Sequence, residues 1–73
     1  MKERLAGIFK KMFDVDELSE DMKLGSVNKW NSFAHVEMIL EIENEFGISI
    51  STKDAVELVS VRAILDYLES KRG

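Results

Sequence analysis

The sequence contains no cysteine and no proline, and each absence excludes something. Without cysteine there can be no disulfide bridge and no thiolate metal ligand, so the fold must depend on an apolar core. Without proline, nothing forces a break inside a helix. No apolar run approaches the roughly 20 residues that a membrane-spanning helix needs, and no secretory signal opens the chain. We therefore expect a cytoplasmic protein that does not insert into membranes.

Positive charge and histidine are also scarce. Ten Lys and Arg stand against 14 Asp and Glu, a formal net charge of −4, which argues against binding nucleic acid and suits partners with basic surfaces. His35 is the only histidine, so the chain lacks a histidine pair for zinc and a second imidazole for a proton relay; we expect it to face solvent. Asp14, Asp16, Ser19 and Asp21 suggest a calcium loop only faintly, because other positions of that motif do not match. Neither an enzyme active site nor a metal site is expected.

Apolar side chains recur at helical spacing in three stretches of the chain. They predict helices over residues 2–14, 32–46 and 60–71. Ser51 with Asp54 three residues later resembles a capping box and predicts a short additional helix at 52–57. The stretch between the first two helices carries few apolar positions and is expected to form a long loop. Residues 1–73 should therefore be a single all-α domain, a small four-helix bundle with a long first loop and a short third helix.

The expected helix boundaries depend on capping residues. Gly47 follows the second helix and supplies a left-handed stop, while Ser51 and Ser60 are the expected N-caps of the last two helices. Residues 48–51 alternate like a strand but have no partner strand, so they predict an extended connector. The second helix should bury a broad apolar face made up of Val36, Ile39, Leu40, Ile42 and Phe46.

Ser32 stands at the expected start of the second helix, directly after Asn31. A serine at such a place is typically an N-cap, whose hydroxyl accepts a hydrogen bond from an amide two or three residues further on. Asn31 could serve equally well, which would leave the Ser32 hydroxyl free. No Glu or Gln lies three residues beyond either position, so a capping box does not decide between them. From these residues alone, the cap is the favoured role of Ser32.

Three further features occur together in this chain. An Asn-Ser-Phe triplet at residues 31–33 opens the second helix, an acidic run with Phe-Gly-Ile follows at residues 43–48, and Asp-Tyr-Leu closes the pattern at residues 66–68. The combination resembles the acyl carrier protein family, in which an Asp-Ser-Leu triplet opens a helix that ends in an acidic run. The resemblance covers nearly the whole chain and needs no gap between the triplet and the Asp-Tyr-Leu ending.

The resemblance implies that Ser32 is modified with 4′-phosphopantetheine, a covalent arm that a phosphopantetheinyl transferase takes from coenzyme A. The thiol of this arm would carry acyl groups as thioesters, so a chain without cysteine could still do thiol chemistry. The protein would be a carrier and not an enzyme, and would act as a monomer in fatty-acid, polyketide or related acyl-transfer biosynthesis. Its other partners would be acyl-loading and acyl-using enzymes with basic docking surfaces.

Two sets of site residues follow from the same resemblance. Glu37, Glu41 and Glu45 are spaced four apart on one side of the second helix and are expected, with Asn31 and Phe33, to contact partners; a merely solvated face is the alternative. In the family, the bundle interior can also shelter the acyl chain, although plain core packing is the slightly favoured interpretation here. The candidate pocket residues are Phe33, Ile42, Ile50, Ala55, Leu58 and Ile64.

The sequence also departs from the family pattern. Asn31 and Phe33 replace the usual aspartate and leucine around the serine. Trp30 precedes the triplet, which is more typical of freestanding carriers of specialised pathways than of housekeeping fatty-acid carriers, although it could simply anchor the loop. Two alternatives stay open: an aminoacyl or peptidyl carrier with the same arm, and a helical adaptor protein that has lost the modification.

Overall fold

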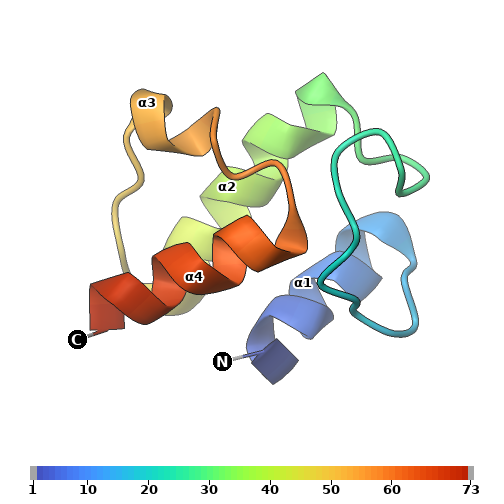
Figure 1. The fold of residues 1–73 in the computed structure, drawn as a ribbon, viewed down its shortest axis with the longest axis horizontal. Helices are drawn as coiled ribbons and strands as arrows, with labels where there is room; N and C mark the ends of the chain where they lie inside the picture. The colour runs from blue at the N-terminus through green and yellow to red at the C-terminus, as the bar shows by residue number, and fades with distance from the viewer. Residues whose placement is uncertain (1, 73) are drawn as a thin grey trace.

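A computed structural model describes residues 2–72, which form four helices and no strand (Figure 1). The helices are α1 (Lys2–Phe13), α2 (Ser32–Phe46), α3 (Thr52–Ala55) and α4 (Val61–Arg72). The expected all-α fold, a small four-helix bundle with a long first loop and a short third helix, is confirmed. Within the described range, no helix combines the length and the apolar character that crossing a membrane requires.

Residues in the left-handed conformation end α1 and α2. Asp14 has a φ of 57° and its amide donates to the carbonyl of Lys10 at 3.0 Å, so a residue expected inside the first helix instead terminates it. Gly47, with a φ of 64°, follows α2 as expected, and its amide donates to the Glu43 carbonyl at 2.9 Å. The observed bounds of α2 are the expected ones, whereas α1 is one residue shorter.

Serine side chains cap α3 and α4, as expected. The Ser51 hydroxyl accepts a hydrogen bond from the Asp54 amide at 3.1 Å, and the Ser60 hydroxyl accepts one from Ala63 at 3.1 Å. The third helix ends two residues earlier than expected because the Glu57 amide turns back to the Asp54 carbonyl at 3.0 Å, in a bond tighter than that of an α-helix. The fourth helix begins and ends one residue later than expected.

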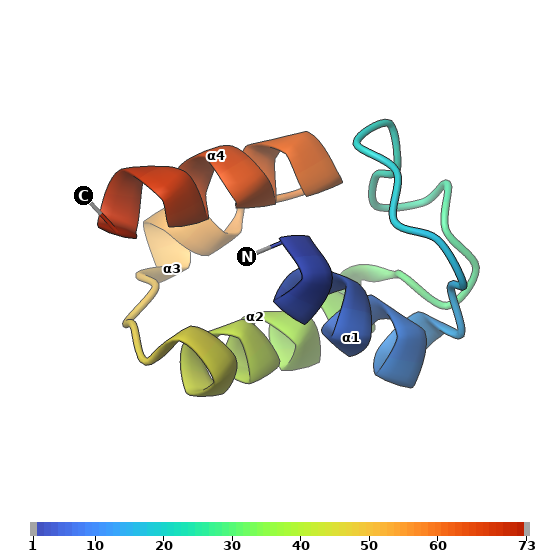
Figure 2. The same cartoon turned by 90° about the horizontal axis from the view of Figure 1, so that it is seen from below.

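The long loop between α1 and α2 is attached to the start of α4. The Leu24 amide donates to the Val59 carbonyl at 2.8 Å, and the Val61 amide donates to the Met22 carbonyl at 2.9 Å, in an isolated antiparallel bridge. The loop thereby covers one end of the bundle (Figure 2). The sequence pattern did not indicate this pairing because so few residues take part in it.

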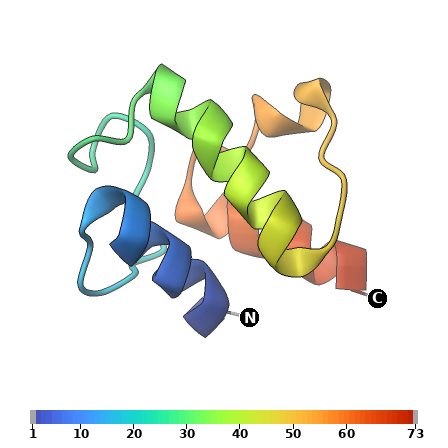
Figure 3. The same cartoon turned by 180° about the vertical axis from the view of Figure 1, so that it is seen from behind.

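The apolar core lies between the helices. Figures 1 and 3 show α2 and α4 on opposite faces of the molecule. The long loop lies at the N-terminal end of α2, α1 lies alongside α2, and α3 lies at the edge between α2 and α4. Buried apolar side chains come from α1, α2, α4, the long loop and the segments on either side of α3. They are Leu5, Ile8, Phe9, Phe13, Trp30, Met38, Ile39, Ile42, Ile50, Leu58, Val61, Ile64 and Leu68.

The buried face of α2 differs from the expected one. Its buried residues are His35, Met38, Ile39 and Ile42. Val36 and Leu40 are 62% and 56% exposed, so the expectation that these two belong to the buried face is wrong. Apolar side chains lie on two sides of this helix, and helical spacing alone does not decide which side meets the core.

Candidate functional site

Ser32 is the first residue of α2 and lies exposed. Asn31 is the N-cap: its backbone is extended, with φ −117° and ψ −177°, and its Oδ1 accepts a hydrogen bond from the Ala34 amide at 2.9 Å. The favoured expectation that Ser32 is the cap is therefore wrong, and the alternative, with Asn31 as the cap, is correct. The Ser32 hydroxyl is not used for capping and lies on the outside of the first turn.

The start of α2 is a favourable place for an anion. The first amides of a helix have no partner within the helix and carry a partial positive charge, and the Asn31 side chain satisfies only the amide of Ala34. The first turn of α2, which the structure describes completely, contains no acidic side chain. A phosphodiester on the Ser32 oxygen would therefore meet unsatisfied amides, an interaction worth about 0.3–1 kcal/mol. The residues present fit a phosphopantetheine group.

Three large apolar side chains lie exposed along α2 beside Ser32. Phe33, Val36 and Leu40 are 77%, 62% and 56% exposed, and their spacing puts them on one side of the helix; we call them the exposed stripe. Phe33 thus points away from the bundle interior, so the expectation that it lines an acyl pocket is wrong. Its expected contact with partners remains a prediction, with which its exposure agrees.

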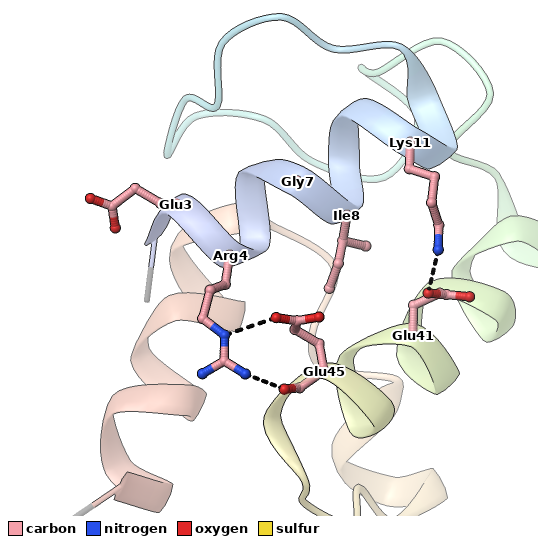
Figure 4. Close-up of a pocket in the computed structure, with 7 residues that line it drawn as sticks. All are labelled: Glu3, Arg4, Gly7, Ile8, Lys11, Glu41 and Glu45. Atoms are coloured by element: carbon pink, nitrogen blue, oxygen red, sulfur yellow. Dashed lines mark hydrogen bonds and ion pairs between the residues drawn. The ribbon is translucent and has the colours of Figure 1, made fainter.

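Glu37, Glu41 and Glu45, the glutamates of α2 that were expected to contact partners, do not present one uniform charge. Glu41 accepts a bond from Lys11 Nζ at 2.9 Å, and Glu45 accepts one from Arg4 Nε at 2.8 Å; the Arg4 guanidinium also bonds the Glu45 carbonyl (Figure 4). Among the side chains that the structure describes, none forms an ion pair with Glu37. Cations of α1 therefore compensate two of the carboxylates, and the carboxylate nearest Ser32 along the helix is left uncompensated.

These ion pairs bridge a groove between α1 and α2 (Figure 4). The groove measures about 290 Å³ and is lined by Glu3, Arg4, Gly7, Ile8, Lys11, Glu41 and Glu45. A Cβ atom added at Gly7 would meet nothing within 4 Å, so the groove is open on that side. Because its cations and carboxylates satisfy one another, it does not offer a ready site for an anion. Nor do residues 2–72 bring together three His, Cys, Asp or Glu side chains that could hold a metal ion.

His35 is only 8% exposed, so the expectation that it faces solvent is wrong. The Trp30 indole donates from Nε1 to His35 Nδ1 at 3.1 Å, and the planes of the two rings differ by only 17°, with the ring centroids 6.1 Å apart. On its other side, His35 Nε2 lies 2.9 Å from the carbonyl oxygen of Ala55, at the end of α3. The sequence held one signal of this burial: His35 precedes Met38 and Ile39 by three and four residues, the spacing of one helix face.

Trp30 anchors the long loop, as one of the two interpretations of this residue held. It is 1% exposed, its ring packs edge-on against Phe9 with centroids 5.1 Å apart, and it stacks on Phe13 at 5.8 Å. Its carbonyl accepts a hydrogen bond from the Gly25 amide at 3.1 Å. The chain is therefore held firmly to α1 two residues before Ser32.

The other candidate pocket residues lie in the core or against it. Ile42, Ile50, Leu58 and Ile64 are at most 9% exposed, and Ala55 is partly buried and packs on the core. This placement agrees with both interpretations, a wall of an acyl pocket and plain core packing. The pocket therefore remains a prediction for these five residues.

Contacts from two other helices hold α3. None of its four residues is buried. The Tyr67 hydroxyl, on α4, donates to Asp54 Oδ2 at 2.9 Å. Burial, together with this hydrogen bond, raises the pKa of Tyr67 above its ordinary value of 10.0. With the His35 contact to Ala55, this bond places α3 between α2 and α4.

Comparisons with known proteins agree with this arrangement. The model of the family described as phosphopantetheine attachment site matches residues 3–68. The acyl carrier protein of Solidesulfovibrio magneticus is 32% identical over 60 residues, which are 82% of this chain and 77% of the relative. That of Chlorobium phaeobacteroides is 32% identical over 56 residues, 77% and 72% of the two chains. That of Rickettsia bellii is 26% identical over 59 residues, 81% and 73% of the two chains.

The fold and the family match together place the molecule among the carriers that hold a substrate on a phosphopantetheine arm. Within that class, the chain belongs to the acyl carrier protein family. Its prosthetic group is a covalently attached 4′-phosphopantetheine, and members of the family are carriers and not enzymes. They interact with a phosphopantetheinyl transferase and with enzymes that load or use acyl groups. The expected family and cofactor are confirmed.

Proposed function

We propose that Ser32 carries the 4′-phosphopantetheine arm. The protein then presents acyl groups, held as thioesters on that arm, to enzymes of fatty-acid, polyketide or related acyl-transfer biosynthesis. The observation that supports this most directly is at the start of α2, where Asn31 makes the cap and Ser32 keeps an exposed hydroxyl beside unsatisfied amides. The proposal treats residues 1–73 as one domain that acts as a monomer in the cytoplasm, a compartment that must also hold coenzyme A.

The chemistry of the modification assigns a simple part to this chain. Ser32 Oγ attacks the phosphorus of coenzyme A that bears the pantetheine, and a new P–O bond forms as the phosphoanhydride bond breaks. Adenosine 3′,5′-bisphosphate leaves, and the hydroxyl proton passes to a base of the transferase. The chain holds the hydroxyl outward and offers helix amides to the resulting phosphodiester. The arm supplies the thiol that a chain without cysteine lacks.

The docking surface is proposed to be the side of α2 that carries Ser32. The exposed stripe supplies apolar area for a partner to bury, and Glu37 supplies an uncompensated charge for a basic surface. Asn31 and Phe33, on either side of the serine, are the nearest contacts to the arm. Glu41 and Glu45 contribute where basic side chains of the partner compete with the cations of α1.

An acyl pocket is proposed on the inner side of the same helix. Its walls are Ile42, from α2, and Ile50, Ala55, Leu58 and Ile64, from the segments that face it across the core. Ile42 is buried in the core, and the other four side chains belong to the same apolar cluster or pack against it, which is the environment that an acyl chain would need.

Intact-mass measurement tests the attachment site. The wild-type protein is incubated with coenzyme A, Mg²⁺ and a broad-specificity phosphopantetheinyl transferase, and should gain one phosphopantetheinyl increment. Ser32→Ala should gain none, while Ser49→Ala, which removes another exposed serine hydroxyl, should behave as the wild type. A wild type that gains no mass would support the unmodified adaptor instead, and a Ser32→Ala variant that still gains mass would exclude this serine.

A further inference from the structure

We infer that His35 is a positioning residue of the carrier site. In a single neutral tautomer, its ring links the first turns of α2 to the loop before α2 on one side and to the end of α3 on the other. The inference deepens the proposed function and rests on it, because the arm is assigned to Ser32, three residues before His35. It is carried by the two hydrogen bonds of the buried ring and by the exposure of α3.

The two hydrogen bonds fix the state of the ring. A neutral imidazole has one donor nitrogen and one acceptor nitrogen. The Trp30 indole can only donate, so His35 Nδ1, at 3.1 Å, must be the acceptor. The ring proton is then on Nε2 and is donated to the Ala55 carbonyl at 2.9 Å. The Nε2–H tautomer satisfies both partners, and no other protonation state does.

One end of this connection is rigid. Trp30 is 1% exposed and packs on two aromatic rings of α1, so its indole N–H has a fixed position. A half-turn of the His35 ring would put carbon atoms against both of its partners. The bond to Trp30 therefore also holds Nε2 in its direction toward α3.

The other end of the connection, α3, depends on hydrogen bonds to neighbouring helices for its position. A helix of four residues does not form on its own in water, and no residue of α3 is buried. The Ala55 carbonyl, at the C-terminus of α3, accepts the Leu58 amide at 3.1 Å, and His35 provides a second donor to the same oxygen. Tyr67 tethers α3 to α4 through Asp54, whereas His35 tethers it to the helix that carries Ser32.

The consequence for docking concerns the residues next in the chain. Val36 and Val56 directly follow the two bonded residues and are 62% and 64% exposed. A partner that covers both helices meets an apolar surface whose α3 part stays in place while the His35 bond is made. If α3 is released, a smaller fraction of the protein has the conformation that a partner can bind. The apparent affinity for the partner is then reduced in proportion to that fraction, while the reactivity of Ser32 is unchanged.

The wild-type protein itself gives the first test. The chain has one histidine and one tryptophan, so their ring nitrogens give single signals in ¹⁵N-resolved NMR. At neutral pH we expect Nε2 of His35 protonated, Nδ1 unprotonated, and the Trp30 Nε1 proton protected from exchange. A Nδ1–H tautomer, or averaging between the two tautomers, would overturn the inference. This test needs neither a variant nor a transferase.

Two amide substitutions then separate the two bonds. His35→Gln places a side-chain amide near the position of Nε2 and keeps the donor to Ala55, whereas His35→Asn places one near Nδ1 and keeps only the acceptor for Trp30. In His35→Asn, the amide protons of Ala55 and Val56, which bond back into α3, should exchange about threefold to tenfold faster. In His35→Gln, the exchange rates of these amides should stay within about twofold of the wild type, because the hydrogen bond to the Ala55 carbonyl is kept. Equal protection in the wild type and His35→Asn would overturn the inference.

Both variants are compared under conditions in which they are equally folded. Amide exchange in α1 and α4, which should not change, shows that this condition is met. As substrates of the transferase, His35→Asn should show a KM raised by at most the factor by which amide exchange in α3 becomes faster, with kcat unchanged, and His35→Gln should resemble the wild type. Equal KM values for the wild type and His35→Asn would contradict the role in positioning. A wild type that accepts no arm would instead contradict the proposed function, and the tautomer and exchange results would still decide the inference about His35.

Discussion

Asn31 and Ser32 divide two tasks that one side chain could not perform together. A serine that capped α2 would direct its oxygen at a backbone amide, and esterifying that oxygen would disturb the cap. Here the cap oxygen belongs to Asn31, at 2.9 Å from the Ala34 amide. Modification of Ser32 therefore leaves the start of α2 intact, and the new phosphodiester can still use the amides that remain unsatisfied.

Tyr67 should make the stability of this small protein depend on pH in the alkaline range. Its pKa is raised above 10.0 in the folded state by burial and by the bond to Asp54, so folding favours the neutral phenol. The stability that Tyr67 contributes is fully present below pH 10.0 and is lost as the pH rises through the raised folded value. We expect the free energy of unfolding, measured in urea, to fall more steeply above about pH 10 for the wild type than for Tyr67→Phe.

The comparison with Tyr67→Phe isolates the phenol because the lysines titrate in both proteins over the same range. Asp54→Asn serves as a second control, since it keeps an acceptor for the hydroxyl and removes the neighbouring negative charge. Parallel pH profiles for the wild type and Tyr67→Phe would show that Tyr67 ionises equally easily in the folded and unfolded chains.

The ion pairs between α1 and α2 change what the acidic helix offers to a partner. Like charges four residues apart oppose helix formation by a few tenths of a kcal/mol per pair, and Lys11 and Arg4 relieve this repulsion at Glu41 and Glu45. The same cations reduce the attraction that these carboxylates exert on a basic surface. Glu37 has no such compensation among the described side chains, so it should dominate the electrostatic encounter.

Neutralising single carboxylates tests this ranking. We expect Glu37→Gln to lower kcat/KM for transfer of the arm about threefold at low salt, and Glu41→Gln to lower it less, with the difference shrinking as salt screens the charges. Glu17→Gln, on the long loop beside α1, is the control for a change in net charge alone. Equal losses at positions 37 and 41, or a loss as large at position 17, would refute the ranking.

Local patterns predicted the helices well, because each one depends on neighbours in the chain. The caps at Ser51 and Ser60 and the left-handed Gly47 follow from such patterns, and so do the bounds of α2. Contacts between distant segments were not predictable in this way. The ion pairs of α1 with α2 join residues 30 and 41 positions apart, and no local rule selects them.

The same limit explains the errors at the site. Helix α2 carries apolar residues on two sides, and only the packing of α1, α4 and the loop decides that the side of His35 is buried and that of Phe33 is exposed. A lone histidine on a polar-looking stretch is usually solvated, so its burial required a specific partner, which Trp30 provides. Ser32 was identified through its place in the chain and the family resemblance, and its freedom from capping became visible only in the structure.

The molecule as a whole has a small core, so each buried side chain carries a large share of its stability. A chain of 73 residues buries only about 60% of its unfolded surface, and at about 0.05–0.15 kcal/mol per residue its free energy of unfolding should be about 4–11 kcal/mol. Losing one large core side chain removes a substantial part of that margin. If an acyl chain enters a core of this size, some contacts between core side chains must be replaced by contacts between those side chains and the acyl chain.

Ile64, on α4, is the side chain that best tests this exchange. It is 0% exposed and is one of the proposed pocket walls. We expect Ile64→Ala to lower the free energy of unfolding by about 2–5 kcal/mol, and Ile64→Val by about 0.5–1.5 kcal/mol, because truncation leaves a cavity. If the acyl chain enters beside Ile64, loading the arm on Ser32 with a medium-length linear acyl group should restore part of the loss in Ile64→Ala by filling that space.

The matched control is Leu5→Ala, which truncates an equally buried side chain on α1, outside the set of pocket candidates. Thermal unfolding of each variant is measured with the unloaded and the acylated arm. Acylation should raise the Tm of Ile64→Ala by more than it raises the Tm of the wild type. The increase in Leu5→Ala should be no larger than the increase in the wild type. An equal gain in both alanine variants would mean that the acyl chain stabilises the protein without filling the Ile64 cavity. No gain in either would assign Ile64 to core packing alone, because a cargo that never enters the interior cannot compensate for a side chain missing there.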